Sequence, residues 1–287
     1  MKKKITFLLF WATAICFGQI KMFEPDVISD DQSFGITMSP DGRKALFVKA
    51  YGGRDSLHLF ESYYKNGAWQ QPKKAFFANK TFNEIDPSYT PDGNGILFNS
   101  LISEDAGYDV FMLKKTQMGW TKPYKLPEAI NTEQHEFYAT MALNKNIYFT
   151  RRMDSNDIYM SQWREEGYQP AIPVSGLNTD TSDSNPYISP DEDFLIFISR
   201  REGGFGNADL YVSFRKNNKW SNPINLGVKI NTEVSEFCPT LDLKNKKFLF
   251  SRTIFENELR IENIYSIPLR KLNLKKLKKQ AKWELLE

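Results

Sequence analysis

Apolar and polar residues alternate along this chain in short runs that turn residues separate. The clearest example spans residues 185–213, where Tyr187-Ile188-Ser189 leads into Pro190-Asp191 and two more β-rich runs follow, at 194–197 and 209–213. A period of two is typical of strands, and proline and aspartate favour tight turns. This stretch therefore predicts three strands joined by one tight turn and one loop.

Related copies of this stretch recur at intervals of roughly 50 residues, which indicates a repeat architecture. Five repeats are found, at residues 30–83, 84–134, 135–182, 183–234 and 235–269. Each offers four short β-rich runs, although the third repeat is degenerate at its first turn, Leu143-Asn144-Lys145. Four strands in a repeat of this length predict an all-β fold, a β-propeller whose sheets pack radially around a channel.

The ends of the chain decide how the ring closes. The fifth repeat lacks a fourth strand, and residues 22–28 resemble the missing one, because they offer an aromatic residue, a proline and then apolar residues. We therefore predict five four-stranded blades, with the N-terminal strand completing the last and removing two open edges. A sixth blade is the alternative, but it would need residues 267–287, whose pattern is helical instead.

Residues 270–287 predict a short, basic, amphipathic helical tail. Leu274, Leu277, Ala281 and Leu285 recur at helical spacing with lysines between them. Three interpretations stay open: the tail lies on an anionic membrane surface, docks on a partner, or packs back on the propeller.

Residues 1–18 predict a secretory signal peptide. Lys2-Lys3-Lys4 precede an apolar segment at 5–15, and we place cleavage before Gln19, so that the propeller occupies 19–269. The predicted location is the periplasm or the outside of the cell. An outer-membrane lipoprotein anchored through Cys16 is less favoured, because Ile15 is a poor residue before such a cysteine. The one other cysteine, Cys238, lies in an apolar strand, which predicts a buried thiol.

The charge balance bears on the class of partner. Without Lys2, Lys3 and Lys4 the chain holds 35 basic and 35 acidic residues. The tail has seven basic against two acidic residues, a net of +5, which leaves the body near −5. A negative body argues against nucleic acid as the partner of the main domain.

One face of the predicted ring concentrates charged residues. In a propeller, the loop between blades and the loop between the second and third strands open on the same face. The first loop carries the acids Glu84, Glu136, Asp183 and Glu236, and the second carries the arginines Arg151, Arg152, Arg200, Arg201 and Arg252. Such a face would bind a polar ligand, or two of its carboxylates would act as the acid and base of glycoside hydrolysis. Repetition in four blades favours a third interpretation, in which each acid pairs with an arginine or caps backbone N–H groups.

We predict structural roles for the other candidate residues. Asp109, Asp157 and Asp209 open the third strand of their repeats and could bind a metal, but no stretch has the spacing of a calcium-binding loop. Trp69, Trp120 and Trp220 could stack on sugars, but their fixed place in the repeat favours packing between blades. Since no nucleophile, phosphate-loop or Cys-x-x-Cys motif is present, we predict no catalytic residue, no metal and no cofactor.

Four features together resemble the WD-like propeller repeats of TolB-like exported bacterial proteins. They are the Ser-Pro-Asp-Gly turn (39–42), the second strand ending in Phe, the Asp-Ile/Leu-Tyr strand and the Gly-x-Trp-x-x-Pro motif (119–123). The resemblance covers most of residues 30–269 and is strongest in repeats 2 and 4. It implies a propeller in the periplasm or outside the cell that mediates protein contacts.

These observations predict a non-catalytic protein-binding or scaffold module at the bacterial cell envelope, with a glycan as a second candidate ligand. The alternative is a carbohydrate-active enzyme with carboxylates in the central funnel. Geometry separates the two, because a glycosidase needs two unpaired carboxylates roughly 5–10 Å apart. A scaffold would instead hold these carboxylates neutralised by arginine.

Overall fold

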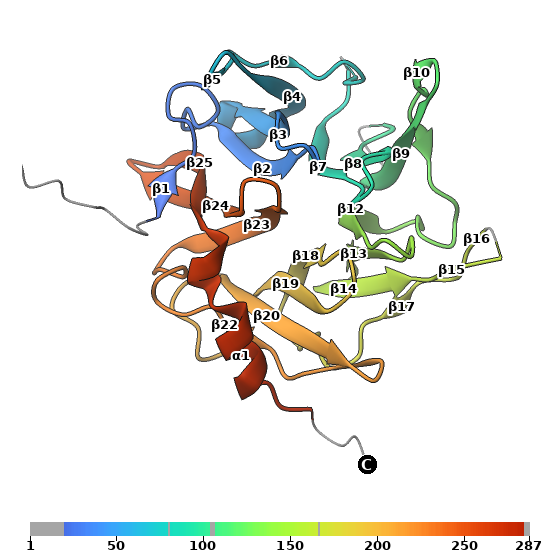
Figure 1. The fold of residues 1–287 in the computed structure, drawn as a ribbon, viewed down its shortest axis with the longest axis vertical. Coiled ribbons are helices and arrows are strands. Elements are labelled where there is room, and N and C mark those ends of the chain that lie inside the picture. Colours follow the sequence, from blue (N-terminus) through green and yellow to red (C-terminus); the bar gives the residue numbers. More distant parts are fainter. Residues whose placement is uncertain (1–19, 80, 104–106, 166, 284–287) are drawn as a thin grey trace, which may run out of the picture.

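The computed structural model describes residues 20–79, 81–103, 107–165 and 167–283. The predicted signal peptide and Cys16 lie outside these residues. Five antiparallel sheets stand around a central axis, one sheet per repeat (Figure 1). The predicted five-bladed β-propeller is therefore confirmed, and the six-bladed alternative is not what the chain forms.

Each blade runs from an innermost to an outermost strand. Blade 1 holds β2 (Ser33–Met38), β3 (Lys44–Tyr51), β4 (Ser56–Lys65), β5 (Ala68–Trp69) and β6 (Lys73–Lys74). Blade 2 holds β7 (Glu84–Tyr89), β8 (Gly95–Ser100), β9 (Asp109–Thr116), β10 (Gly119–Trp120) and β11 (Tyr124–Lys125). Blade 3 holds β12 (His135–Met141), β13 (Ile147–Arg152), β14 (Asn156–Ser161) and β17 (Ile172–Pro173), with a separate hairpin of β15 (Trp163–Arg164) and β16 (Gly167–Tyr168).

Blade 4 holds β18 (Asp183–Ile188), β19 (Phe194–Ser199), β20 (Asp209–Lys216), β21 (Lys219–Trp220) and β22 (Ile224–Asn225). Blade 5 holds β23 (Ser235–Asp242), β24 (Lys247–Glu256), β25 (Leu259–Pro268) and the N-terminal β1 (Lys21–Met22). A 3₁₀ turn, η1 (Gly52–Arg54), follows β3.

The N-terminal segment closes the ring as predicted. Lys21 and Met22 pair with Ser266 and Tyr265 of β25, and the Phe23 N–H donates to the Ile264 carbonyl at 2.7 Å. The strand is shorter than the predicted 22–28, because the chain turns at Glu24, whose carbonyl accepts three backbone N–H groups. The closing strand pairs an edge of blade 5 that would otherwise be open.

One aromatic residue in each second strand belongs to an apolar cluster that is shared with the preceding blade. The side chains at this position are fully or almost fully buried: Phe47, Phe98, Phe149, Phe197 and Phe250. Each lies against an aromatic ring of the third strand in its own blade, with centroids 5.7–6.4 Å apart. The motif of a strand ending in Phe is therefore the sequence signal of the core.

The tryptophans Trp69, Trp120 and Trp220 pack against the preceding blade. Trp120 lies 6.0 Å from Phe76, and Trp220 lies 6.1 Å from Tyr148. Trp69 contacts Phe23 of the ring-closing segment at 5.9 Å. These contacts confirm the interpretation of the repeated tryptophans as packing residues.

The innermost strands share a bulge that shapes the channel. One residue in each has a left-handed backbone with φ between 50° and 58°: Gly35, Asp86, Tyr138, Asn185 and Cys238. Side chains of the preceding blade stabilise three of these bulges, since Ser251, Asn99 and Thr150 accept the N–H of Gly35, Tyr138 and Asn185 at 2.9–3.0 Å. Non-glycine residues rarely adopt this conformation, so the surrounding structure must hold it.

The tail packs back on the propeller. It forms a 3₁₀ turn, η2 (Leu269–Leu272), and α1 (Leu274–Gln280), which is shorter than the predicted 270–287. Leu274, Leu277, Ala281 and Trp283 lie against the apolar cluster of blades 4 and 5. In the described part of the chain, no helix has the length and apolar character needed to span a bilayer.

The ring has two faces, the junction face and the turn face. The junction face bears the loops between blades and the loops between second and third strands. The turn face bears the turns between first and second strands, and α1 lies over it at blades 4 and 5 (Figure 1).

Candidate functional site

Three of the four predicted acids are buried in a repeated bracing arrangement. Glu136 accepts the backbone N–H of Thr132 at 3.0 Å and its hydroxyl at 2.6 Å. Arg151 donates to Glu136 from Nε at 2.7 Å and to the Ile130 carbonyl at 2.9 Å. The acid is thus neutralised and holds the loop that enters blade 3.

The same arrangement recurs at the next two junctions. Asp183 accepts the N–H and hydroxyl of Thr179 at 2.7 Å, and Arg201 donates to Asp183 at 2.7 Å. Glu236 accepts from Thr232 at 3.1 and 2.6 Å and from Arg252 at 2.9 Å. Burial raises the pKa of Glu236, while Thr232 and Arg252 oppose that shift. These three pairs have the form that the structural interpretation of the acids predicts.

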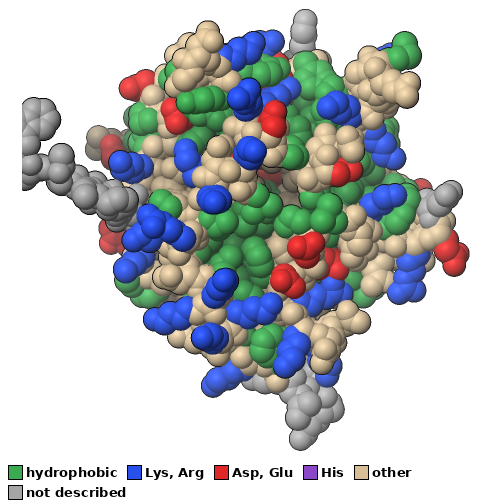
Figure 2. Space-filling model, in the orientation of Figure 1, with side chains coloured by type: hydrophobic (Ala, Val, Ile, Leu, Met, Phe, Trp, Pro, Cys, Tyr) green, Lys and Arg blue, Asp and Glu red, His purple; other side chains and the backbone are tan. Residues whose placement is uncertain are grey.

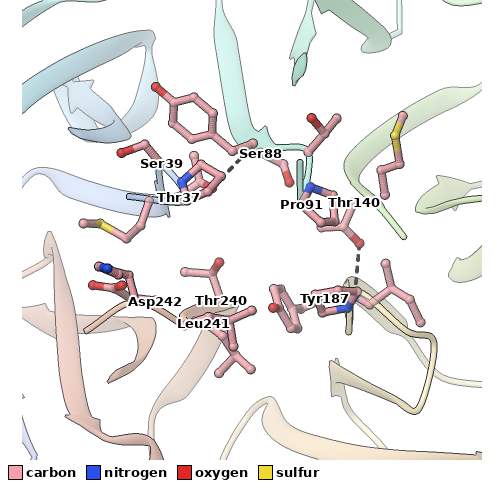
Figure 3. A pocket seen from close by; sticks show the side chains of 18 residues that line it. Thr37, Ser39, Ser88, Pro91, Thr140, Tyr187, Thr240, Leu241 and Asp242 are labelled. Atoms are coloured by element: carbon pink, nitrogen blue, oxygen red, sulfur yellow. Dashed lines mark hydrogen bonds between the residues drawn. The ribbon is translucent and has the colours of Figure 1, made fainter. Parts of the chain in front are cut away.

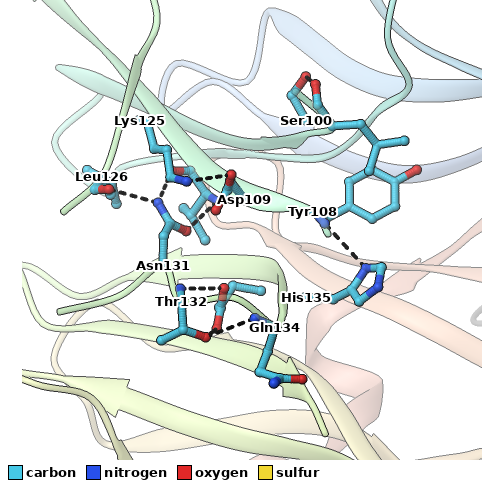
Figure 4. A network of polar contacts seen from close by, with 12 residues as sticks. Ser100, Tyr108, Asp109, Lys125, Leu126, Asn131, Thr132, Gln134 and His135 are labelled. Atoms are coloured by element: carbon cyan, nitrogen blue, oxygen red, sulfur yellow. Dashed lines mark hydrogen bonds and ion pairs between the residues drawn. The ribbon is translucent and has the colours of Figure 1, made fainter. Parts of the chain in front are cut away.

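An asparagine before each threonine completes the brace. The Asn131 amide accepts the Val110 N–H at 2.7 Å and donates to the carbonyls of Val110 and Leu126 at 3.0 and 2.8 Å. Figure 4 shows Asn131 between the strand that begins with Asp109 and the loop that carries Thr132. Asp109 itself forms an ion pair with Lys125 at 2.8 Å. The repeated Asn-Thr pair therefore fastens the third strand to the loop between blades.

Glu84 differs from the other three acids, because it forms no ion pair with any of the residues that the structure describes, although the charge of Lys74 acts on it. Its register partner in β8 is Ser100, and its carboxylate accepts a hydrogen bond from the Asn79 N–H at 2.9 Å. Burial raises the pKa of Glu84 to about 7. Glu84 is thus a buried carboxyl group that changes charge near neutral pH.

The remaining predicted arginines lie apart from the acids. Arg152 lines a cavity at the channel mouth, where its Nε donates to Asn156 at 3.0 Å and its guanidinium lies 5.4 Å from the Phe137 ring. Arg200 is exposed on the loop after β19, and its backbone N–H donates to the Ser182 carbonyl at 3.0 Å. The predicted ring of acids and arginines is therefore not one continuous site.

A cavity of about 210 Å³ opens at the junction-face mouth of the channel. All five innermost strands contribute to its lining through Phe34, Asp86, His135, Asn185 and Cys238. Arg54, Tyr108, Phe137 and Phe237 also line it. Unlike the braces, this lining differs from blade to blade, as binding sites on symmetric folds usually do.

Asp86 is the buried carboxyl group of this cavity. Burial raises the pKa of Asp86 to about 7, although the charge of Arg54 opposes the shift. The Cys238 thiol lies 3.9 Å from Asp86 Oδ1 and is itself buried, as the sequence predicts, which raises the thiol pKa well above its usual range. Among the described residues, no three His, Cys, Asp or Glu side chains cluster in a way that would hold a metal ion.

Two arginines border the cavity. Arg54 makes a bidentate pair with Glu262 at 2.9 and 2.7 Å, and its guanidinium lies 4.3 Å from the Phe34 ring. Arg152 lies on the other side with Phe137. His135 Nδ1 accepts the Tyr108 N–H at 3.3 Å, which ties the blade 2 loop to the start of β12 (Figure 4). The mouth thus combines aromatic rings, two cations and one buried carboxyl group.

The turn-face end of the channel has a different lining. There one residue per blade forms a ring of Thr37, Ser88, Thr140, Tyr187 and Thr240, shown in Figure 3. The Thr140 hydroxyl donates to the Pro186 carbonyl at 2.6 Å, and Thr37 Oγ1 accepts the Tyr89 N–H at 3.2 Å. Asp242 and Lys244 also line this end, but the Asp242 carboxylate is engaged by Asn245 at 2.9 and 2.7 Å. The junction-face mouth differs in having two arginines and a buried carboxyl group.

Sequence reasoning missed most of this cavity. Arg54, Asp86, Tyr108 and His135 were not among the predicted site residues, and Cys238 was assigned to the core. A signal was present, because Asp86, Tyr138, Asn185 and Cys238 each stand two residues after the repeated acid. That position changes in every blade, whereas the acid persists.

Comparisons with known proteins support the fold alone. No protein-family model matches the chain, and no curated protein matches it. Among solved structures, putative TolB from Agrobacterium tumefaciens has a TM-score of 0.51 at 14% identity and covers 83% of this chain and 83% of its own. A glycoside hydrolase has a TM-score of 0.56 at 9% identity and covers 87% of this chain and 90% of its own.

TolB from Acinetobacter baumannii has a TM-score of 0.49 at 14% identity and covers 83% of this chain but 54% of its own, so this chain spans about half of that protein's length. The chain is thus a β-propeller that is similar in structure to TolB and to glycoside hydrolase propellers.

Proposed function

We propose that this chain is a non-catalytic binding module of the bacterial cell envelope that engages a protein partner at the junction-face mouth of its channel. The main support for this proposal is the contrast between two sets of residues on that face. The repeated acids Glu136, Asp183 and Glu236 are buried and neutralised by arginine. The residues that vary between blades line the mouth instead.

The chemistry of the mouth favours recognition of a polypeptide segment. Phe34, Phe137 and Phe237 supply apolar contact area, and Arg152 and Asp86 supply one cation and one carboxyl group. Aromatic residues and arginine carry most of the binding energy in protein interfaces. A cavity of about 210 Å³ accommodates one or two side chains of a partner rather than a long glycan.

A carbohydrate-active enzyme is the alternative. Its supporting observation is Asp86, because a buried carboxyl group with a raised pKa of about 7 suits a general acid. A second, unpaired carboxylate would have to lie roughly 5–10 Å from it. In the described part of the cavity lining, Asp86 is the one carboxyl group. This favours the binding proposal over hydrolysis.

The proposed location, the periplasm or the outside of the cell, depends on the N-terminal sequence. Lys2-Lys3-Lys4 followed by the apolar segment at 5–15 is the pattern of a secretory signal peptide. The partner would accordingly be another exported or envelope protein.

The test is site-specific photo-crosslinking of the chain from Gln19 onward in envelope extract. A photoreactive residue replaces Tyr108 at the mouth, and a control variant carries it at Lys122 on the outer rim. We expect one protein adduct from position 108 and none from position 122, and we expect Arg152→Glu to weaken the adduct at least tenfold. Arg152 is exposed and outside the braces, so its replacement leaves the fold intact.

A glycan panel assayed in parallel separates the two functions. Sugar release by the wild type that Asp86→Asn abolishes would establish the enzyme and overturn the binding proposal. Equal crosslinking from positions 108 and 122 would show that the mouth is not the recognition surface.

A further inference from the structure

The tail places a concentrated positive charge on the turn face. Seven basic side chains between Arg270 and Lys282 are exposed, and no acidic residue occurs in that interval. They are Arg270, Lys271, Lys275, Lys276, Lys278, Lys279 and Lys282. Lys244 and Lys246, in the turn between β23 and β24, are exposed beside them. Glu284 and Glu287 follow in the sequence, outside the described residues.

An apolar groove lies within this basic surface. It encloses about 1220 Å³ between the tail and the turn of blade 5. Pro268, Leu269 and Leu274 contribute its apolar floor, and five cations surround that floor: Lys246, Arg270, Lys275, Lys276 and Lys279. We call these eight residues the tail groove. Figure 2 shows this face, with hydrophobic side chains gathered and lysines and arginines around them.

The five cations of the tail groove have no carboxylate within ion-pair distance among the described residues, whereas their neighbour Lys278 lies 3.8 Å from Asp193. Asp193 and the exposed Asp191 lie in the turn of blade 4, where α1 ends. The groove therefore has an unbalanced positive rim. Its charge is available to an external anion.

A ligand of the tail groove must both neutralise the positive charge of the rim and cover the apolar surface of the floor. A polyanion such as nucleic acid would neutralise the rim but leave Pro268, Leu269 and Leu274 exposed to water. An anionic phospholipid satisfies both, because its phosphate meets the lysines and its acyl chain covers the apolar floor. The helix itself does not insert, since Leu274, Leu277 and Ala281 already pack on the propeller.

We propose that the tail groove docks on a bilayer rich in anionic phospholipid, with lysines on the headgroups and one acyl chain in the groove. The propeller then sits with its turn face on the membrane and its junction face directed away. This inference is independent of the junction-face binding site. Both functions can operate at once, because they use opposite faces of the ring.

The test is co-sedimentation of the chain from Gln19 onward with vesicles of phosphatidylcholine containing about 30 mol% phosphatidylglycerol. We expect binding to these vesicles and not to pure phosphatidylcholine. Each lysine near an anionic surface contributes about fivefold in affinity, so Lys275→Gln, Lys276→Gln and Lys279→Gln together should weaken binding roughly 100-fold. Circular dichroism and the midpoint of thermal unfolding verify that the variant is folded.

The matched control removes three exposed cations from the junction-face side of the ring, by Lys74→Gln, Arg200→Gln and Lys229→Gln. The net charge is then identical, and we expect vesicle binding within about twofold of wild type. An equal loss in the two triple variants would show that net charge alone attracts the protein and would overturn the proposal. No binding of the wild type to anionic vesicles would overturn it as well.

Heparin serves as a polyanion without an acyl chain. At about 0.5 M salt, screening shortens the range of electrostatic attraction to a few ångströms. We therefore expect heparin binding to vanish at this salt concentration, while part of the vesicle binding persists. Loss of both together would mean that the apolar floor takes no part and would overturn the lipid as occupant.

Discussion

The junction between blades 1 and 2 and the junction between blades 2 and 3 place the same kind of acid at the same position, with opposite consequences. Glu136 meets Arg151 and Thr132 and is fully neutralised. Glu84 has Ser100 as its register partner, accepts a hydrogen bond from the Asn79 N–H and, among the described residues, forms no ion pair. The comparison teaches that the partner, rather than the acid, decides whether a repeated carboxylate is a brace or a titrating group.

The largest effect is expected when the braced junction is made to resemble the unbraced one. Arg151→Met removes the partner of a fully buried carboxylate, and breaking such a pair costs about 3–5 kcal/mol. The measurement is the free energy of unfolding in urea. Arg152→Met at the exposed neighbouring position is the matched control and should cost less than about 0.5 kcal/mol. Similar losses in both variants would show that Arg151 does not act as a brace.

The next effect concerns pH and the unbraced acid. The folded-state pKa of Glu84 is about 7, above its ordinary value of 4.5, so the folded protein binds more protons between these two values. Stability therefore falls as pH rises from about 4.5 to 7. The glutamine of Glu84→Gln does not titrate. We therefore expect the free energy of unfolding of this variant to exceed that of the wild type by about 1–3 kcal/mol at pH 8 and to equal it near pH 4.

This prediction is checked by urea unfolding of the wild type and of Glu84→Gln between about pH 4 and pH 8. Asp86, whose pKa is also raised to about 7, contributes equally to both proteins and cancels from their difference. A difference that stays constant with pH would mean that Glu84 does not titrate in this window.

The smallest effect concerns the threonine of the brace. Thr232→Val keeps the shape of the side chain but removes the hydroxyl that donates to Glu236 at 2.6 Å. Because the backbone N–H of Thr232 and Arg252 remain, we expect a loss of about 1 kcal/mol in the free energy of unfolding. Thr116→Val at the end of β9 is the control: its exposed hydroxyl donates to the Gly119 carbonyl at 3.0 Å, and its loss should cost less than about 0.5 kcal/mol. A loss as large as that of Arg151→Met would instead make the hydroxyl the main element of the brace.

The sequence was sufficient to predict the repeat, the five blades and the closing strand. Periodic signals carry these features, as in the buried phenylalanine that recurs in each second strand, such as Phe98 and Phe149. It also placed the acids and arginines on one face. It could not tell that Arg151 reaches Glu136 while Arg152 reaches the channel mouth, because adjacent strand residues point to opposite sides of the sheet and a bulge changes the register.

The channel mouth escaped prediction for a related reason. Arg54, Asp86 and Cys238 come from blades 1, 2 and 5, and only ring closure brings them together. The repeat pattern identifies the positions that every blade shares, and the residues at those positions hold the blades together. Three of the varying positions that stand two residues after an acid line the cavity: Asp86, Asn185 and Cys238. In a symmetric fold, departure from the repeat is thus the better guide to a binding site.

The most direct test of this account is the free energy of unfolding of Glu84→Gln and Glu136→Gln, measured side by side at pH 8. The two substitutions should change the free energy of unfolding in opposite directions. Glu84→Gln should stabilise the protein by about 1–3 kcal/mol, because it removes a buried charge that has no ion pair among the described residues. Glu136→Gln should destabilise it by about 2–4 kcal/mol, because it leaves Arg151 without its carboxylate partner. Changes of the same sign would contradict the claim that the arginine partner determines the role of each junction acid.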